Sequence, residues 1–250
     1  MSTVDYDHAK NTHTLEGPRA AIAEIFGPAM PSSLLDVGCG NGTWLKAALD
    51  AGISDVFGID GIDLGEAKLV PDRYFSRHDL QKPFDLKRAF DVAFCFEVGE
   101  HLDANAAALL IESLARHSAT IYFSAAIPNQ PGQHHINCQW PEYWQHLFNN
   151  AGYVCEDSVR WRIWRDSRIE PWYRQNMFTA RRDPQNAGSE KRIEPVIHPD
   201  MVIHVGVAAA EAMRAKAQEA LPASPVQTKS PSSAWKTRLS KIRIKLTGRK

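Results

Sequence analysis

Two aspartates, Asp36 and Asp60, each close a short apolar stretch, and glycines crowd the residues that follow the first of them. In LLDVGCGNGTW the glycines alternate with other residues, at Gly38, Gly40 and Gly42. Glycine tolerates positive φ and lets the backbone approach a ligand closely. A carboxylate at the same place repels a phosphate and attracts a cation. The stretch therefore predicts a binding site for a ligand that carries positive charge.

The spacing of these glycines excludes the two common phosphate-binding loops. A dinucleotide fingerprint reads G-x-G-x-x-G. Counted from Gly38 or from Gly40, its sixth position here is Thr43 or Leu45. No lysine directly follows the last glycine, as a P-loop would require. We therefore do not expect a nicotinamide-dependent oxidoreductase or a P-loop protein.

Groups that can accept a proton occur in two further stretches. The second half of FDVAFCFEVGEHL contains Glu97, Glu100 and His101. His101 suits a general base because an unperturbed imidazole titrates near neutral pH, and packing at the start of a helix is the alternative. IPNQPGQHHINCQWPEYW has the composition of a loop, with His134 and His135 at its centre. Binding groups concentrate in such loops, and two incidental surface histidines are the alternative.

The stretch LLDVGCGNGTW resembles motif I of class I S-adenosylmethionine-dependent methyltransferases, in its D-x-G-x-G-x-G form. Asp60 stands where that family places the acid that binds the ribose hydroxyls, and Asp79 of RHDL where a residue faces the adenine amine. The resemblance covers roughly residues 15–180 and implies S-adenosylmethionine as the cofactor. The cofactor-binding residues that it implies are Asp36, Gly38, Cys39, Gly40, Gly42, Asp60, Gly61, Asp79, Leu80 and Glu97. Without the resemblance, Asp36 could cap the next helix, and Asp60 and Asp79 could lie in solvated turns.

The same resemblance implies the chemistry. We expect methyl transfer to a small-molecule or glycan acceptor, at oxygen rather than nitrogen, with His101, His135 and Glu97 as the catalytic residues. HHIN and WYRQN resemble segments of bacterial methyltransferases tied to polysaccharide or secondary pathways. The alternative is a catalytically silent methyltransferase-like protein that acts through its basic C-terminal tail.

A metal is considered and not expected. Glu97-x-x-Glu100-His101 is similar to the metal-binding E-x-x-E-H segment of ubiquinone-type O-methyltransferases, in which two carboxylates and an imidazole would hold magnesium. An E-H pair after this strand is also common in class I methyltransferases that bind no metal. The four cysteines form no CxxC pair, so neither a zinc site nor a disulfide framework is expected.

The elements that position these residues alternate along the chain. Strands are expected at SLLDVG, DVFGID, FDVAFCFEV, TIYFSAA, YVCEDSVRWRIW and WYRQNMFTARR. Helices are expected at residues 18–26, 42–52, 105–117 and 141–152. This alternation predicts an α/β fold with a mainly parallel sheet covered on both faces. The family implied has a Rossmann-like, seven-stranded sheet, and the last strand is expected to pair antiparallel.

Five of the seven tryptophans lie between residues 140 and 172. Their faces can stack on a sugar or another planar acceptor, and packing in the core is the more common role of such residues. The sequence alone favours the core.

The pattern stops after Arg182, so we expect a methyltransferase domain over residues 1–182 and an extension over residues 183–250. The extension reads as a linker, an Ala-rich helix and a basic tail. The last 25 residues hold eight Lys or Arg and no acid, although the whole chain has 29 of each sign. Residues 235–250 are therefore a candidate for peripheral contact with an anionic membrane. A disordered terminus and nucleic-acid contact are the alternatives; we expect no specific nucleic acid and a cytoplasmic location.

Overall fold

A computed structural model describes residues 14–62 and 64–219 of the chain. The chain divides into two units, Met1–Glu211 and Ala212–Lys250. The first unit contains the sheet and the candidate site. Of the second unit, the structure describes only the end of a helix. No helix within the described residues is long and apolar enough to cross a membrane.

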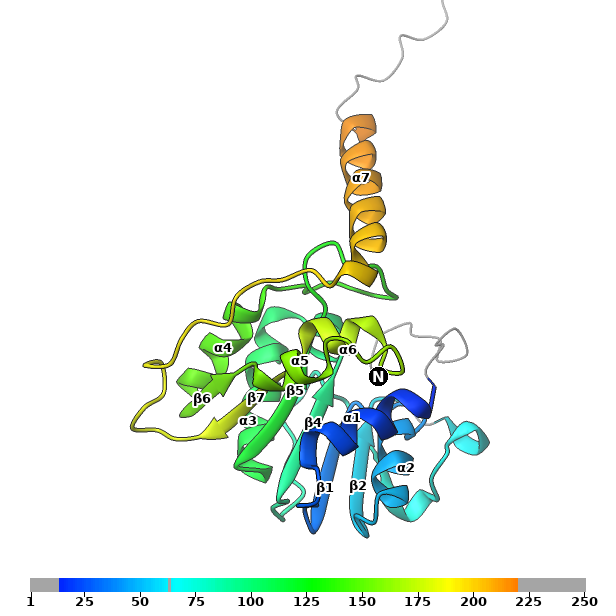
Figure 1. The fold of residues 1–250 in the computed structure, drawn as a ribbon, viewed down its shortest axis with the longest axis vertical. Helices are drawn as coiled ribbons and strands as arrows, with labels where there is room; N and C mark the ends of the chain where they lie inside the picture. The colour runs from blue at the N-terminus through cyan, green and yellow to red at the C-terminus, as the bar shows by residue number, and fades with distance from the viewer. Residues whose placement is uncertain (1–13, 63, 220–250) are drawn as a thin grey trace, which may run out of the picture. The chain divides into compact units, whose positions relative to one another are not determined.

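The first unit is built on a seven-stranded sheet in the order β3-β2-β1-β4-β5-β7-β6 (Figure 1). The first five strands in this order are parallel, and β7 pairs antiparallel with both β5 and β6. The strands are β1 Ser33–Val37, β2 Asp55–Asp60, β3 Phe75–Arg77, β4 Val92–Phe96, β5 Thr120–Ser124, β6 Tyr153–Glu156 and β7 Phe178–Arg182. This topology confirms the expected Rossmann-like methyltransferase fold, in which the last strand along the chain, β7, pairs antiparallel.

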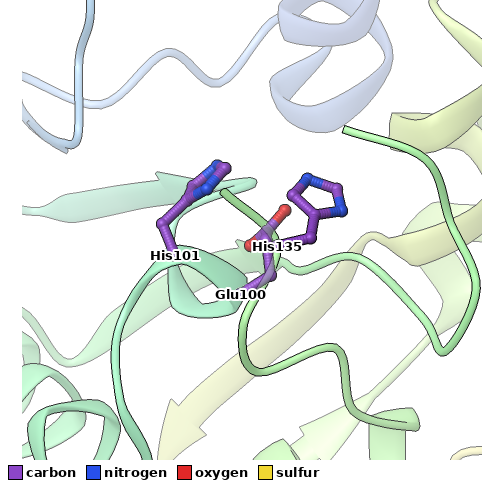
Figure 2. Close-up of side chains that lie close together, drawn as sticks. All are labelled: Glu100, His101 and His135. Atoms are coloured by element: carbon purple, nitrogen blue, oxygen red, sulfur yellow. The ribbon is translucent and has the colours of Figure 1, made fainter. Parts of the chain in front are cut away.

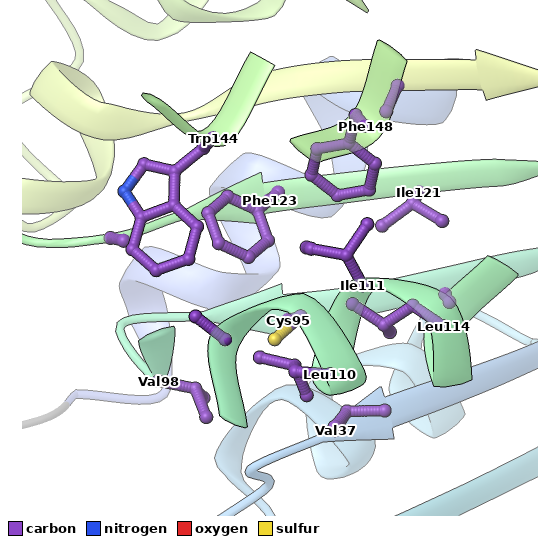
Figure 3. Close-up of a cluster of buried hydrophobic side chains, with 14 of the residues drawn as sticks. Val37, Cys95, Val98, Leu110, Ile111, Leu114, Ile121, Phe123, Trp144 and Phe148 are labelled. Atoms are coloured by element: carbon purple, nitrogen blue, oxygen red, sulfur yellow. The ribbon is translucent and has the colours of Figure 1, made fainter. Parts of the chain in front are cut away.

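Helices cover both faces of the sheet. They are α1 Glu16–Phe26, α2 Thr43–Asp50, α3 Ala104–His117, α4 Pro141–Asn150, α5 Ser158–Ile163 and α6 Pro171–Asn176. The last described helix, α7 Val202–Glu219, begins in the first unit and ends in the second. Side chains alternate across a strand, so the buried strands supply two cores. Val37, Cys95 and Phe123 pack on α3 and α4 (Figure 3). Leu34, Phe94 and Tyr122 pack with α1, α2, α5 and α6 on the other face.

Two of the expected strands are half wrong. YVCEDSVRWRIW forms a strand only over β6 and continues as the short helix α5, because Val159 and Ile163 bury one face at helical spacing. WYRQNMFTARR begins within α6, where Pro171 occupies the first turn, and becomes a strand only at Phe178. The three-residue strand β3 was not predicted, because its residues show no buried pattern.

Residues 183–211 belong to the first unit, although the sequence boundary was expected at Arg182. Ile193 is buried in the core, and its amide donates to Oε1 of Gln145 at 2.8 Å. Arg174 of α6 pairs with Asp200 at 2.8 Å. The Ala-rich stretch lies in α7, and the basic tail lies outside the described residues.

Candidate functional site

A cavity of about 460 Å³ opens where β1, β2 and β4 end. In a parallel sheet the carboxyl ends of the strands share one edge, and ligands bind in the crevice outside that edge. The described residues that line the cavity include nine of the ten residues expected to bind the cofactor, all except Gly42, and both histidines expected to be catalytic, His101 and His135.

The loop after β1 needs glycine for two reasons. Gly38 has φ 78° and Gly42 has φ 82°, a region that favours glycine. A Cβ atom on Gly38 would also lie 2.2 Å from Cγ2 of Val98. Because Gly38 has no side chain, the loop can adopt this conformation and can lie directly against the segment after β4.

Asp36 lies inside β1 and is only 2% exposed. Its Oδ2 has no hydrogen-bond partner among the described residues. Burial, and then the neighbouring carboxylate of Asp60, raises the pKa of Asp36 to about 8. Helix α2 begins after Gly42 without a side-chain cap, so Asp36 is not a helix cap. Its environment favours the neutral carboxyl until a cation lies nearby.

Asp60 ends β2 and ties two loops together. Its Oδ2 accepts a hydrogen bond from the amide of Gly40 at 2.8 Å, and its Oδ1 accepts one from Ile62 at 2.9 Å. A carboxylate oxygen has more than one acceptor position, so Asp60 can still receive hydroxyl donors from the cavity. It is therefore both a support for the loop after β1 and a wall of the cavity.

Asp79 and Leu80 line the cavity from the segment after β3. Asp79 accepts from the amide of Gln81 at 3.1 Å and pairs with Lys82 at 2.9 Å. The hydrogen bond from Lys82 is the main reason that the pKa of Asp79 is lowered. The adenine contact expected for Asp79 stays a prediction.

Glu97 follows β4 with φ 54°, an unusual conformation for a residue with a side chain. Its carboxylate accepts from Nε2 of Gln130 at 2.9 Å and from Nδ2 of Asn176 at 3.1 Å. Burial raises the pKa of Glu97, and these amide donors oppose the rise. Sequence reasoning missed Gln130 and Asn176. The only available signal was that polar residues follow β5 and precede β7, two neighbouring strands.

The expected catalytic histidines come together. The rings of His101 and His135 lie with their centroids 5.1 Å apart. In the view of Figure 2 the carboxylate of Glu100 lies between the two rings. Nδ1 of His135 is 2.9 Å from the carbonyl of Gln130, and Nδ1 of His101 is 3.2 Å from that of His134. Ligand atoms of Glu100, His101 and His135 lie within 4.8 Å of one another.

Burial and the neighbouring groups favour the neutral forms of His101 and Glu100. Burial, and then His135, lowers the pKa of His101 to about 4. Burial, and then the charge of Glu97, raises the pKa of Glu100. The imidazole of His101 is therefore neutral at neutral pH and offers a lone pair rather than a positive charge.

Aromatic side chains form another part of the cavity wall. Trp44, Phe96, Trp172 and Tyr173 line it, and Nε1 of Trp44 donates to the hydroxyl of Tyr173 at 3.3 Å. Among the tryptophans between 140 and 172, stacking on an acceptor stays a prediction. Trp144 is buried in the core, whereas Trp172 faces the cavity.

The comparisons with known proteins agree with this arrangement. The model of a family described as "Methyltransferase domain" matches residues 10–175. No curated protein sequence matches the chain. Among solved structures, Streptomyces venezuelae DesVI is 17% identical with a TM-score of 0.51, over 67% of this chain and 92% of that one.

Two other solved structures are similar at the same level. The methyltransferase domain of bacterial CtHen1 is 18% identical with a TM-score of 0.51, over 68% of this chain and 100% of that one. The sugar N-methyltransferase KedS8 from Streptoalloteichus sp. is 18% identical with a TM-score of 0.50, over 70% and 90%. At these identities the structures support the fold. The family match spans most of the chain and includes the loop after β1 and the cavity residues up to Tyr173, so the protein belongs to this family of methyltransferase domains.

Proposed function

We propose that the protein transfers a methyl group from S-adenosylmethionine to a hydroxyl group of a small, hydroxylated molecule such as a sugar. The observation that carries the proposal is a cavity lined by two chemically different groups of residues, which we call its cofactor end and its acceptor end. One end is the glycine loop with Asp36 and Asp60. The other is the group of lone-pair donors formed by Glu100, His101 and His135.

The residues at the first end fit the cofactor. S-adenosylmethionine carries a sulfonium and an ammonium group, and the described residues that line the cavity include five acids but no Lys or Arg. The unpartnered oxygen of Asp36 suits one of these positive charges. Asp60 suits the ribose hydroxyls, since a carboxylate pairs well with two neighbouring donors.

The residues at the second end fit an oxygen acceptor. In an in-line displacement, the acceptor oxygen forms a bond to the methyl carbon as the carbon–sulfur bond breaks, and the sulfonium becomes a neutral thioether. The hydroxyl proton must leave, and the lone pairs of the imidazoles and carboxylate are positioned to stabilise the oxygen as it does. Glu97, held by two amides, positions the neighbouring loop.

The class of acceptor is supported by the cavity wall. Trp172 lines the cavity and offers an aromatic ring of the kind that stacks on sugar rings. The similar structure KedS8 is a sugar N-methyltransferase, which supports a sugar as the acceptor class. The choice of oxygen rests on the imidazoles of His101 and His135.

An isotope-transfer assay tests this function. Methyl-labelled S-adenosylmethionine is incubated with the protein and a panel of sugars and phenols, and labelled products are separated. We expect label on a hydroxylated acceptor. Label only on amines would contradict transfer to oxygen, and binding of the cofactor without any transfer would favour the silent interaction protein.

His135→Ala is the first variant to compare in that assay. We expect its turnover to fall at least tenfold, because a lone pair at the acceptor end is lost, while affinity for S-adenosylmethionine changes less than about twofold. His134→Asn is the matched control. It removes the adjacent imidazole, and Asn tolerates the positive φ of 52° at that position. Equal losses of turnover and thermal stability in His135→Ala would show a structural histidine instead.

A further inference from the structure

We propose that Glu100, His101 and His135 bind a divalent cation of the first transition series at the acceptor end of the cavity. The inference deepens the proposed function and rests on it for the identity of the acceptor. The cation itself can be tested independently of methyl transfer.

Glu100 provides the strongest observation. The residue is fully buried, and neither of its carboxylate oxygens has a hydrogen-bond partner among the described residues. A buried carboxylate without an opposite charge beside it is unfavourable. The described residues that line the cavity beside it include no Lys or Arg that could compensate. A cation held at this carboxylate would supply the missing charge.

The geometry of the three side chains suits one ion. Their ligand atoms lie within 4.8 Å of one another. Ligands that are each about 2.0–2.2 Å from a metal lie at most about 4 Å apart, so small side-chain rotations complete the coordination. His135 donates Nδ1–H to the carbonyl of Gln130, which leaves the lone pair on Nε2. Such carbonyl contacts orient metal-binding histidines, and His101 has one to His134.

The ligand types select the class of metal. Magnesium and calcium prefer oxygen ligands throughout. Two imidazoles with one carboxylate are instead typical of zinc and non-haem iron. The E-x-x-E-H segment suggested Glu97, Glu100 and His101 as metal ligands. We take His135 as the third ligand instead of Glu97, because the carboxylate of Glu97 accepts hydrogen bonds from Gln130 and Asn176.

Three protein ligands leave further coordination positions for a molecule in the cavity. His101, His135 and Glu100 all line that cavity. A hydroxyl oxygen bound to such a cation loses its proton more readily than in water, as metal-bound water does. The group would therefore both position the acceptor and favour its oxyanion at neutral pH.

Cobalt(II) is a suitable probe because its visible spectrum reports its ligands. We titrate the full-length protein with Co²⁺ and expect one ion per chain, with d–d absorption and no thiolate charge-transfer band. Glu100→Gln and His135→Ala should each weaken binding at least tenfold. His134→Asn, which removes the neighbouring imidazole outside the cluster, should bind Co²⁺ as the unaltered protein does.

Two results would overturn the inference. One is that the unaltered protein does not bind Co²⁺, and the other is that Glu100→Gln and His135→Ala bind Co²⁺ as tightly as the unaltered protein does. A thiolate band would likewise place the ion on a cysteine. Thermal melting confirms that each variant is folded, and the partly exposed loop residue His135 decides the matter should Glu100→Gln unfold. A parallel titration with S-adenosylmethionine separates the proposals. Binding of S-adenosylmethionine without binding of Co²⁺ would contradict only the proposed cation site. Binding of Co²⁺ without binding of S-adenosylmethionine would contradict the proposed methyl-transfer function.

Discussion

Asp36 shows how one residue is shaped for a cationic ligand. Its carboxyl is buried, one oxygen lacks a partner among the described residues, and its pKa is raised to about 8. In the ligand-free protein the charged form is therefore unfavourable at neutral pH. A sulfonium or ammonium group beside it would reverse that preference, because an opposite charge stabilises the carboxylate.

The raised pKa predicts how stability depends on pH. An acid with a folded-state pKa above its unfolded value of 3.8 contributes stability below pH 4 and loses it as pH rises through about 8. Asp36→Asn keeps the shape without the charge. We therefore expect the ligand-free variant to gain stability over the unaltered protein between pH 4 and 8, with a constant difference above that. Urea unfolding at pH 5, 7 and 9 measures this, and a difference that is the same at all three would contradict it.

At the residue scale, the sequence predicted the cofactor end of the cavity better than the acceptor end. Asp36, Gly38 and Asp60 are close in sequence to strand ends, so a local motif contains them. Glu97 depends on Gln130 and Asn176, which lie 33 and 79 positions further along the chain. Contacts at that separation are set by strand order, which one sequence does not reveal.

The loop between β1 and α2 is the element on which the cofactor end depends. Gly38 lies where the loop passes the segment after β4, and its φ of 78° and its contact with Val98 both exclude a larger residue. The amide of Gly38 also donates to the carbonyl of Ile59 at 2.8 Å, which links β1 to β2.

We predict that Gly38→Ala weakens binding of S-adenosylmethionine at least tenfold and lowers the free energy of unfolding by about 1–3 kcal/mol, the usual cost of such strain. Gly27→Ala is the matched control, because Gly27 also has positive φ but no atom within 4 Å of its Cβ position. The control should lose stability but keep cofactor binding. Calorimetric titration of both variants measures the contrast, and normal affinity in Gly38→Ala would show that the loop does not cradle the cofactor.

Elements with a strong apolar pattern were predicted correctly, and short ones were not. The buried strands β4 and β5 carry continuous apolar runs, and β1 has two leucines and a valine around Asp36; such patterns need no tertiary information to recognise. Helices α5 and α6 have six residues each, too few for a helical period to stand out from a strand. Helix α5 packs against α1 and β7, and α6 packs against α5 and β5, so tertiary contacts favour their helical state.

For the whole molecule, the unequal distribution of charge remains to be explained. Residues 226–250 hold eight basic residues and no acid, so the other 225 residues hold 21 basic and 29 acidic residues. Contacts between solvated charges are screened beyond about 8 Å at physiological salt. We therefore propose that the basic tail has an external partner, an anionic membrane surface.

We predict that the full-length protein sediments with vesicles rich in anionic lipid and that a chain ending at Gln227 does not. Each basic residue near such a surface contributes about 1 kcal/mol, so binding should fall steeply as salt rises. Methyl transfer to a soluble acceptor should survive the truncation, because the residues lining the cavity all precede Ala212. Equal behaviour of the two chains towards vesicles would exclude a membrane role for the tail.

Calorimetric titration with S-adenosylmethionine, of the unaltered protein and of Asp60→Ala, measures whether the protein binds this cofactor and whether Asp60 holds it. The account predicts that the unaltered protein binds this cofactor and not NAD, and that Asp60→Ala binds it at least tenfold more weakly, since a charged hydrogen-bonding partner contributes about 1.5–3 kcal/mol. Asp55→Ala, at the other end of the same strand, should bind as the unaltered protein does. Unchanged affinity in Asp60→Ala, or binding of NAD in place of S-adenosylmethionine, would contradict the account.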